Sequence, residues 1–386
     1  MIVPSIFRER WPVLLLGLAA YVSTFLFLHL EQEWEIALLL GIVPLVLYVA
    51  KKSGMSAKCR QAVGVAPVFT KVVFLLSALA LIVTLRHEHF ALLLLATVLL
   101  YATISLGLTI QFGYAGLVNF AAIAFFGIGA YTMAVLNQSQ NGLPDLMIIV
   151  IGGVVAALIG SLLILPVLRT KGHYAALITI AFGLLFRSFL EVNDILGGPQ
   201  GLKVSGLNIL GWDFAQSFPA ILGGGSFYVS YTLLALVLLI CVFSMTRLIE
   251  SSWLGLNMDS VRLDETASAS FGINVARWKI MAFTVGNFFA GMSGALYASM
   301  SGFVAPASFN LSDSLLLVSI VLLGGMGNAV SVIPAAFLVV VLPEKFQVIQ
   351  EYRLLLFAVI VILILRFKPS GLMPRPLRRL INTSSK

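Results

Sequence analysis

Charged side chains gather in a polar segment, residues 253–282, that lies between two apolar runs of the chain. Its charged residues and glycines include, in chain order, Gly255, Asp259, Arg262, Asp264, Glu265, Gly272 and Arg277. Acids and bases mixed in this way suit ion pairs with another protein surface. The alternative is a solvated linker whose polar side chains cap short helices. We expect a folded element that contacts a partner.

The sequence contains no catalytic constellation. It holds no G-x-x-x-x-G-K-[ST] phosphate loop, no H-E-x-x-H motif and no nucleophile elbow. Its four histidines are scattered, and its two cysteines form neither a disulfide framework nor a metal site. We therefore expect no catalytic residue, no metal and no ATPase site in this chain, and an intramembrane enzyme is disfavoured.

Two glycine-rich breaks interrupt long apolar runs. Broken helices at membrane depth are tolerated where they line a cavity, and their free ends can bind small ligands. The alternative is that the glycines permit close helix packing, which we favour for Gly127, Gly129, Gly291 and Gly294. The candidate pathway residues at the two breaks are Gly113, Tyr114, Gly116 and Asn119, and Gly324, Gly325 and Gly327.

Arg187 is the main ionisable residue within an apolar run, and it precedes Glu191 by four residues. Ionisable side chains inside membrane spans are costly and mark function by default, so Arg187 is a further pathway candidate. The alternative is an i,i+4 ion pair near the outer end of a helix. Few buried acids accompany it, which disfavours a carrier coupled to protons or sodium ions.

The composition requires a membrane environment. The chain has 386 residues, of which 60% are apolar and 10% charged, and its mean hydropathy is +1.04. Soluble domains carry about 25% charged residues. The apolar runs are continuous, which is typical of helices and excludes the alternating strands of a β-barrel. We predict an all-α polytopic membrane protein with about ten to twelve spanning or half-spanning helices.

The distribution of basic residues predicts the topology. The net charge of +8 comes from Lys and Arg in short loops, which fix orientation and do not indicate nucleic acid. They place both termini in the cytoplasm, together with a basic loop after Lys52 and a tail that carries Arg375. The predicted spans include 117–136, 280–300 and 354–365, and the broken run Leu315–Leu342 must start and finish on one side. We predict N-terminal accessory helices over 1–89, a transmembrane core over 90–376 with a cytoplasmic loop at 247–278, and a basic tail over 377–386.

Several stretches resemble the permease subunits of bacterial branched-chain amino-acid ABC importers, in particular the M-type subunit of the LIV system. The resemblance covers residues 100–375 in the family's order and spacing. The stretches that carry it are LGLTIQFGYAGLVNFAAIAFFGIGAYTMAVL from Leu106, VLRTKGHYAALITIAFGLLFR from Val167, GGPQGL from Gly197, DETASASFGINVARWKIMAFTVGNFFAGMSGALYASMSGFVAPASF from Asp264, LLGGMGN from Leu322 and RFKPSGLMP from Arg366.

The resemblance implies an ABC importer permease in the bacterial inner membrane. It implies as partners a second related permease, two ATPase subunits that bind ATP and Mg, and an extracytoplasmic binding protein that delivers a branched-chain amino acid. The polar segment then resembles the loop that docks on an ATPase subunit, through Gly255, Arg262, Asp264, Glu265 and Gly272.

The chain departs from the family pattern at four positions of these segments. Leu256, Asn257 and Leu263 stand where the docking loop usually carries an arginine, an alanine and an acid. Leu184 stands where a glutamate is common. We therefore expect a less charged docking contact, and no role of that glutamate is carried over.

Other functions stay open at this point. A permease of the same superfamily for urea, short amides or another small solute has the same sequence features, because the binding protein selects the solute. A carrier or channel that works alone would transport without an ATPase.

Overall fold

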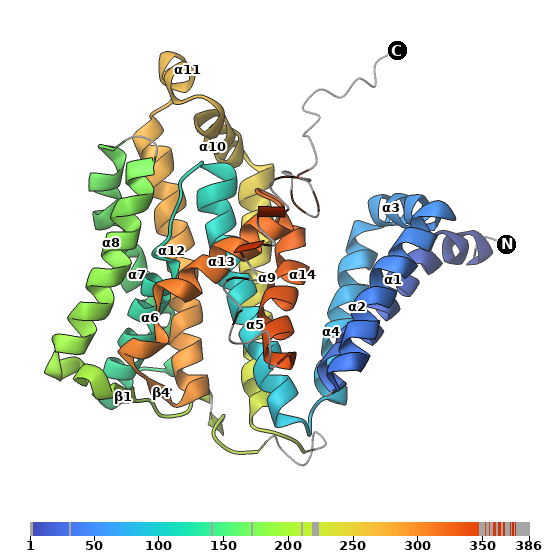
Figure 1. Ribbon diagram of the computed structural model, residues 1–386, viewed down its shortest axis with the longest axis horizontal. Helices are drawn as coiled ribbons and strands as arrows, with labels where there is room; N and C mark the ends of the chain where they lie inside the picture. Colours follow the sequence, from blue (N-terminus) through green and yellow to red (C-terminus); the bar gives the residue numbers. More distant parts are fainter. Residues whose placement is uncertain are drawn as a thin grey trace.

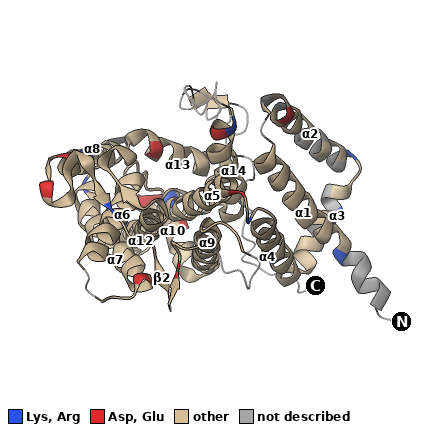
Figure 2. Cartoon of the chain, turned by 90° about the horizontal axis from the view of Figure 1, so that it is seen from below, with Lys and Arg blue, Asp and Glu red and all other residues tan. Residues whose placement is uncertain are grey.

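The computed structural model describes residues 3–346 except 31, 140–141, 171–172, 210 and 218–223, together with scattered positions from 352 to 375. Eight helices in this part are long and apolar enough to cross a membrane. Lys, Arg, Asp and Glu are sparse along them (Figure 2). The chain is thus an all-α polytopic membrane protein, as predicted. Most of the predicted last span, Leu354–Leu365, and the tail 377–386 lie outside the described residues.

Four N-terminal helices stand beside the rest of the molecule (Figure 1): α1 (Val3–His29), α2 (Glu33–Lys52), α3 (Met55–Val65) and α4 (Pro67–Thr84). The phenyl ring of Phe27 packs edge-on against Phe337, with 5.6 Å between the ring centroids. The basic stretch after Lys52 was predicted to be a loop, but it contains α3. Its alanines, lysine and glutamine favour a helix, which the charge pattern did not reveal.

The remaining long helices form one bundle: α5 (His89–Leu108), α6 (Ala122–Gln138), α7 (Asp145–Leu168), α8 (His173–Val192), α9 (Tyr228–Ser251) and α12 (Val275–Ser301). The helix α12 packs against α5, α6 and α7. Its backbone approaches theirs at glycines: a Cβ atom at Gly129 would collide with the carbonyl of Gly291, and one at Gly294 with that of Phe126. The packing role favoured for Gly129, Gly291 and Gly294 agrees with these contacts. At Gly127, for which the same role was favoured, a Cβ atom would meet the Phe186 ring at 2.7 Å.

Short irregular elements close the bundle at one end, called here the β1 end (Figure 1). Strand β1 (Leu202–Lys203) pairs antiparallel with β4 (Phe303–Val304), and β2 (Asn208–Ile209) with β3 (Trp212–Asp213). Three single-turn 3-10 helices accompany the strands: η2 (Asp194–Leu196), η3 (Gly198–Gln200) and η5 (Pro306–Ser308). The β1–β4 ladder ties the long loop after α8 to the end of α12.

The opposite end carries α10 (Trp253–Leu263) and α11 (Glu265–Ser270), and is called here the α10 end (Figure 1). The polar segment is therefore two short helices followed by the start of α12. The predicted span Ile280–Met300 begins five residues too late, because the Asn274 side chain accepts a hydrogen bond from the Arg277 amide, 3.1 Å away, and starts α12 at Val275.

Both predicted breaks are present. The helix α5 continues into a π-helical turn, η1 (Thr109–Tyr114), and α6 begins only at Ala122, five residues after the predicted Leu117. The second run divides into α13 (Leu311–Gly324) and α14 (Ala329–Lys345). These two helices form a hairpin with its bend at residues 325–328.

Candidate functional site

Polar side chains cap the short helices of the segment predicted to dock on an ATPase subunit, residues 252–274, called here the docking segment after that prediction. The Ser252 hydroxyl accepts a hydrogen bond from the Leu254 amide at 3.2 Å. The Asp264 carboxylate accepts from the amides of Thr266 and Ala267 at 2.8 and 2.9 Å. At the far end, Gly272 has a φ of +80°, which favours glycine and lets the chain turn into α12. Asp264 and Gly272 thus shape the segment.

The surface of the docking segment is more apolar than its sequence suggests. Trp253, Leu263 and Phe271 are 67%, 79% and 86% exposed. Gly255 lies buried within α10, and Glu265 pairs with the Lys279 ammonium at 2.6 Å. Leu256, which is 40% exposed, adds to this apolar face. The less charged docking contact expected from Leu256 and Leu263 stays a prediction.

The two glycine breaks lie against each other. A Cβ atom on Gly113 would stand 2.5 Å from the amide nitrogen and 2.6 Å from the Cα of Gly327. The approach is therefore backbone on backbone. Gly325 and Gly327 have φ values of +116° and +85°, which favour glycine in the bend between α13 and α14.

The helix α10 reaches the first break. Gly116 has a φ of +69°, and a Cβ atom there would lie 3.1 Å from the Cγ of Arg262 and 3.5 Å from its Cα. The structure thus joins a residue predicted for ATPase docking to one predicted for the pathway. Tyr114, two residues before Gly116 in the first break, is fully buried.

Four charged side chains of alternating sign lie in a row between α9, α10 and the C-terminal part of the chain: Arg247, Glu250, Arg375 and Asp259. Arg247 donates to the Glu250 carboxylate at 2.7 Å, and the Arg375 guanidinium lies 3.5 Å from the same carboxylate. Arg375 also donates to Asp259 at 2.6 Å and stacks 4.5 Å above the Tyr114 ring. Burial opposes the charge of Arg375, but the hydrogen bond and charge of Asp259 outweigh it and raise the pKa of the guanidinium.

Glu250 and Arg375 were missed as site residues. Arg375 was assigned to the basic residues that set topology. The available signal was Glu250, an acid at the end of a long apolar run, which indicates a buried partner.

A buried amide cluster holds the first break to α12. The Asn119 amide donates to the carbonyl oxygen of Gln111 at 2.9 Å and to that of Asn287 at 3.2 Å. The Gln111 amide donates to Asn287 and to the Phe283 backbone, both at 3.0 Å. Asn119 was predicted as a pathway residue, whereas Gln111 and Asn287 were not. Such amide pairs join helices within a membrane.

Arg187 lies apart from the breaks. It pairs with Glu191 at 2.8 Å and hydrogen-bonds Asn310, toward the β1 end of α8. Its side chain is 41% exposed. The i,i+4 ion pair is present, as the alternative interpretation required.

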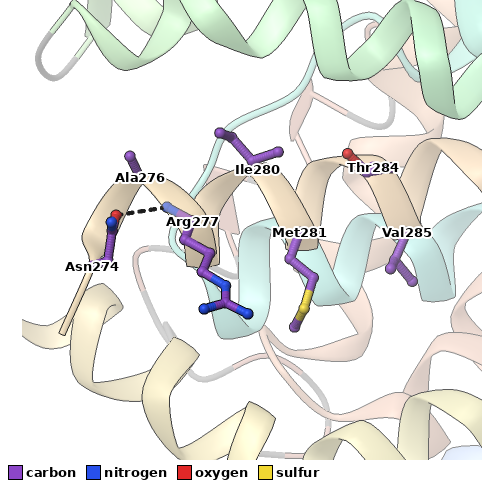
Figure 3. A pocket seen from close by; sticks show the side chains of 7 residues that line it. All are labelled: Asn274, Ala276, Arg277, Ile280, Met281, Thr284 and Val285. Carbon is purple, nitrogen blue, oxygen red and sulfur yellow. Dashed lines mark hydrogen bonds between the residues drawn. The ribbon is translucent and has the colours of Figure 1, made fainter.

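A shallow groove runs along the first turns of α12 (Figure 3). Asn274 and Arg277 stand at its α10 end, and the side chains beyond them are apolar except for Thr284. Its lining residues are Asn274, Ala276, Arg277, Ile280, Met281, Thr284 and Val285. None of the predicted pathway residues lines it, so the groove and the glycine breaks are separate features.

Comparison with known proteins gives consistent matches. The family described as "Branched-chain amino acid transport system / permease component" matches residues 90–365. The high-affinity branched-chain amino acid transport system permease protein LivM of Escherichia coli is 37% identical over 289 residues, 70% of this chain and 68% of that protein. The Salmonella typhimurium LivM is 36% identical over 67% of this chain, and the match spans 64% of its length, slightly under two thirds. A probable LivM of Methanocaldococcus jannaschii is 26% identical over 67% of this chain. No solved structure matches the chain.

Proposed function

The chain belongs to the family of branched-chain amino acid transport permeases, and we propose that it forms half of the translocation pathway of an ABC importer for branched-chain amino acids. It works in the bacterial inner membrane with both termini in the cytoplasm, so that the α10 end faces the cytoplasm. Its partners are a second, related permease, two ATPase subunits that bind ATP and Mg, and an extracytoplasmic binding protein. The chain itself contributes no ATPase site.

The observation that carries the proposal is the contact of α10 with the first glycine break, which in turn contacts the second break. An importer driven by a separate ATPase needs an element that receives the partner's movement and passes it to the pathway. Here α10 touches the first break at Gly116, and the first break touches the second at Gly113 and Gly327. Nucleotide binding must favour one permease conformation over the other, because a partner with equal affinity for both would shift nothing.

Reconstitution of the chain with its neighbouring subunits tests the proposal. We expect uptake of leucine, isoleucine or valine into vesicles that depends on ATP and on the binding protein. A hydrolysis-deficient ATPase subunit should abolish the uptake. Uptake driven by a proton gradient alone would contradict the proposal and favour a secondary carrier. Uptake of urea or short amides in place of amino acids would keep the ATPase mechanism and change the solute.

Phe271→Ser should weaken association of the ATPase subunit with the permease. The ring is 86% exposed, so its removal leaves the permease core intact, and it contributes apolar area to a docking contact. Apolar burial is worth about 25 cal/mol per Å², and we expect an affinity loss of about tenfold. Co-purification of the ATPase at low and high salt measures it.

The matched control is Ile195→Ser, because Ile195 is 88% exposed at the opposite end of the molecule. It should leave ATPase association unchanged. High salt should weaken the wild-type contact only slightly if the contact is apolar. Retention of the ATPase by the Phe271 variant would mean that this face is not the docking surface.

A further inference from the structure

Three described residues near the C-terminus, Gly371, Met373 and Arg375, lie against the bend between α13 and α14, beyond the part of the chain that the family covers. The Met373 amide donates to the carbonyl of Gly324 at 3.2 Å. The Asn328 side-chain amide donates to the Met373 carbonyl at 3.1 Å. Gly371 lies so close to Gly325 that a Cβ atom would collide with its backbone. Gly371 and Met373 are thus a structural part of the second break.

Arg375 contacts α9, α10 and both glycine breaks. Its guanidinium donates to Asp259 of α10 at 2.6 Å and lies 3.5 Å from Glu250 of α9. It stacks over Tyr114 of the first break. A Cβ atom on Gly327, in the second break, would lie 3.0 Å from the Cδ of Arg375. The side chain is only 13% exposed.

This arrangement uses chemistry that other side chains lack. A guanidinium is planar and permanently charged, so it can bond carboxylates along its edge while its face stacks on a tyrosine ring. A lysine offers one point charge and cannot do both. Removal of one partner from a largely buried ion pair leaves the other charge uncompensated. If α10 moved away from the breaks alone, the pair between Arg375 and Asp259 would break and leave a largely buried charge without its partner. Joint movement of α10 and the breaks avoids this cost.

We propose that Arg375 is a positioning residue that ties the docking helix α10 to both glycine breaks, so that displacement of α10 by an ATPase subunit moves the breaks with it. The inference rests on the proposed function, because it assigns the connection between docking and pathway within the same site. The alternative is a purely structural role, in which Arg375 only stabilises the fold.

Arg375→Gln in the complete importer tests the proposal. We expect the ATPase subunits to co-purify and to hydrolyse ATP, while uptake per ATP hydrolysed falls about tenfold or more. Asp259→Asn should show the same defect, and Arg375→Lys should restore only part of the uptake. The matched control is Arg169→Gln, an exposed arginine at the end of α7, which should leave uptake unchanged.

Two results would overturn the proposal. One is that the Arg375→Gln importer takes up as much solute per ATP hydrolysed as the wild type. The other is a loss of uptake in strict proportion to the amount of assembled complex, which a structural role predicts. If Arg375→Gln does not accumulate, the double variant Asp259→Arg with Arg375→Asp tests the proposal, because it exchanges the two charges of this ion pair. Restored uptake per ATP supports the proposal, and restored abundance with uncoupled hydrolysis contradicts it.

A measurement that needs no solute separates this inference from the proposed function. ATP analogues should change hydrogen exchange at residues 324–328 in the wild-type complex and leave it unchanged in the Arg375→Gln complex. If the wild-type importer took up no branched-chain amino acid but still showed this exchange difference, the proposed solute would be wrong. The proposed role of Arg375 would stand. An exchange response that is the same in both complexes would overturn the role of Arg375.

Discussion

Gly113→Ala should abolish most uptake by the reconstituted importer. The added methyl group would stand 2.5 Å from the Gly327 amide nitrogen and 2.6 Å from its Cα, so it must push apart the two breaks. Neither neighbour is a flexible side chain that could rotate away. Overpacking of this kind costs about 1–3 kcal/mol, and it falls on the contact through which we propose α10 moves the second break. Uptake should decrease about tenfold or more, because each 1.4 kcal/mol changes an equilibrium tenfold.

The control for this variant is Gly183→Ala on α8. A Cβ atom at Gly183 would have nothing within 4 Å, so the substitution should leave uptake unchanged. Both variants should be compared at equal amounts of assembled complex. Normal uptake by Gly113→Ala would show that the close contact of the breaks is not needed for transport.

Gly129→Ala should prevent stable folding of the permease bundle. The methyl group would collide with the backbone of Gly291 where α6 crosses α12, and rigid helices on both sides leave it no space. Helix association in membranes depends on such close packing, because lipid solvates apolar side chains as well as another helix does. We expect a destabilisation of about 1–3 kcal/mol or more, measured as a lower melting temperature and a smaller folded fraction in detergent.

Gly41→Ala on α2 is the matched control. It is also a glycine within an apolar helix, but a Cβ atom there would have nothing within 4 Å. Alanine favours a helix over glycine by about 1 kcal/mol, so this variant should be neutral or slightly more stable. If both variants melted with the wild type, the α6–α12 crossing would have more space than the structure gives it.

The sequence by itself determined the class of protein and the places where its helices break. Continuous apolar runs can only be helices in a bilayer, since unsatisfied backbone groups are too costly there. Glycine clusters marked the breaks around Gly113 and Gly324, and charges marked the docking segment. These are local properties, and each is readable within one stretch of about twenty residues.

Only the tertiary structure decided which of these pieces meet. Gly113 contacts Gly327, Gly116 contacts Arg262, and Arg375 pairs with Asp259, although each pair is far apart in the chain. Arg375 in isolation reads as a topology signal, and Asn119 gives no indication of its partners Gln111 and Asn287. Side-chain types constrain what a residue can bind, but the packing of the helices selects its partner, and that packing depends on the whole chain.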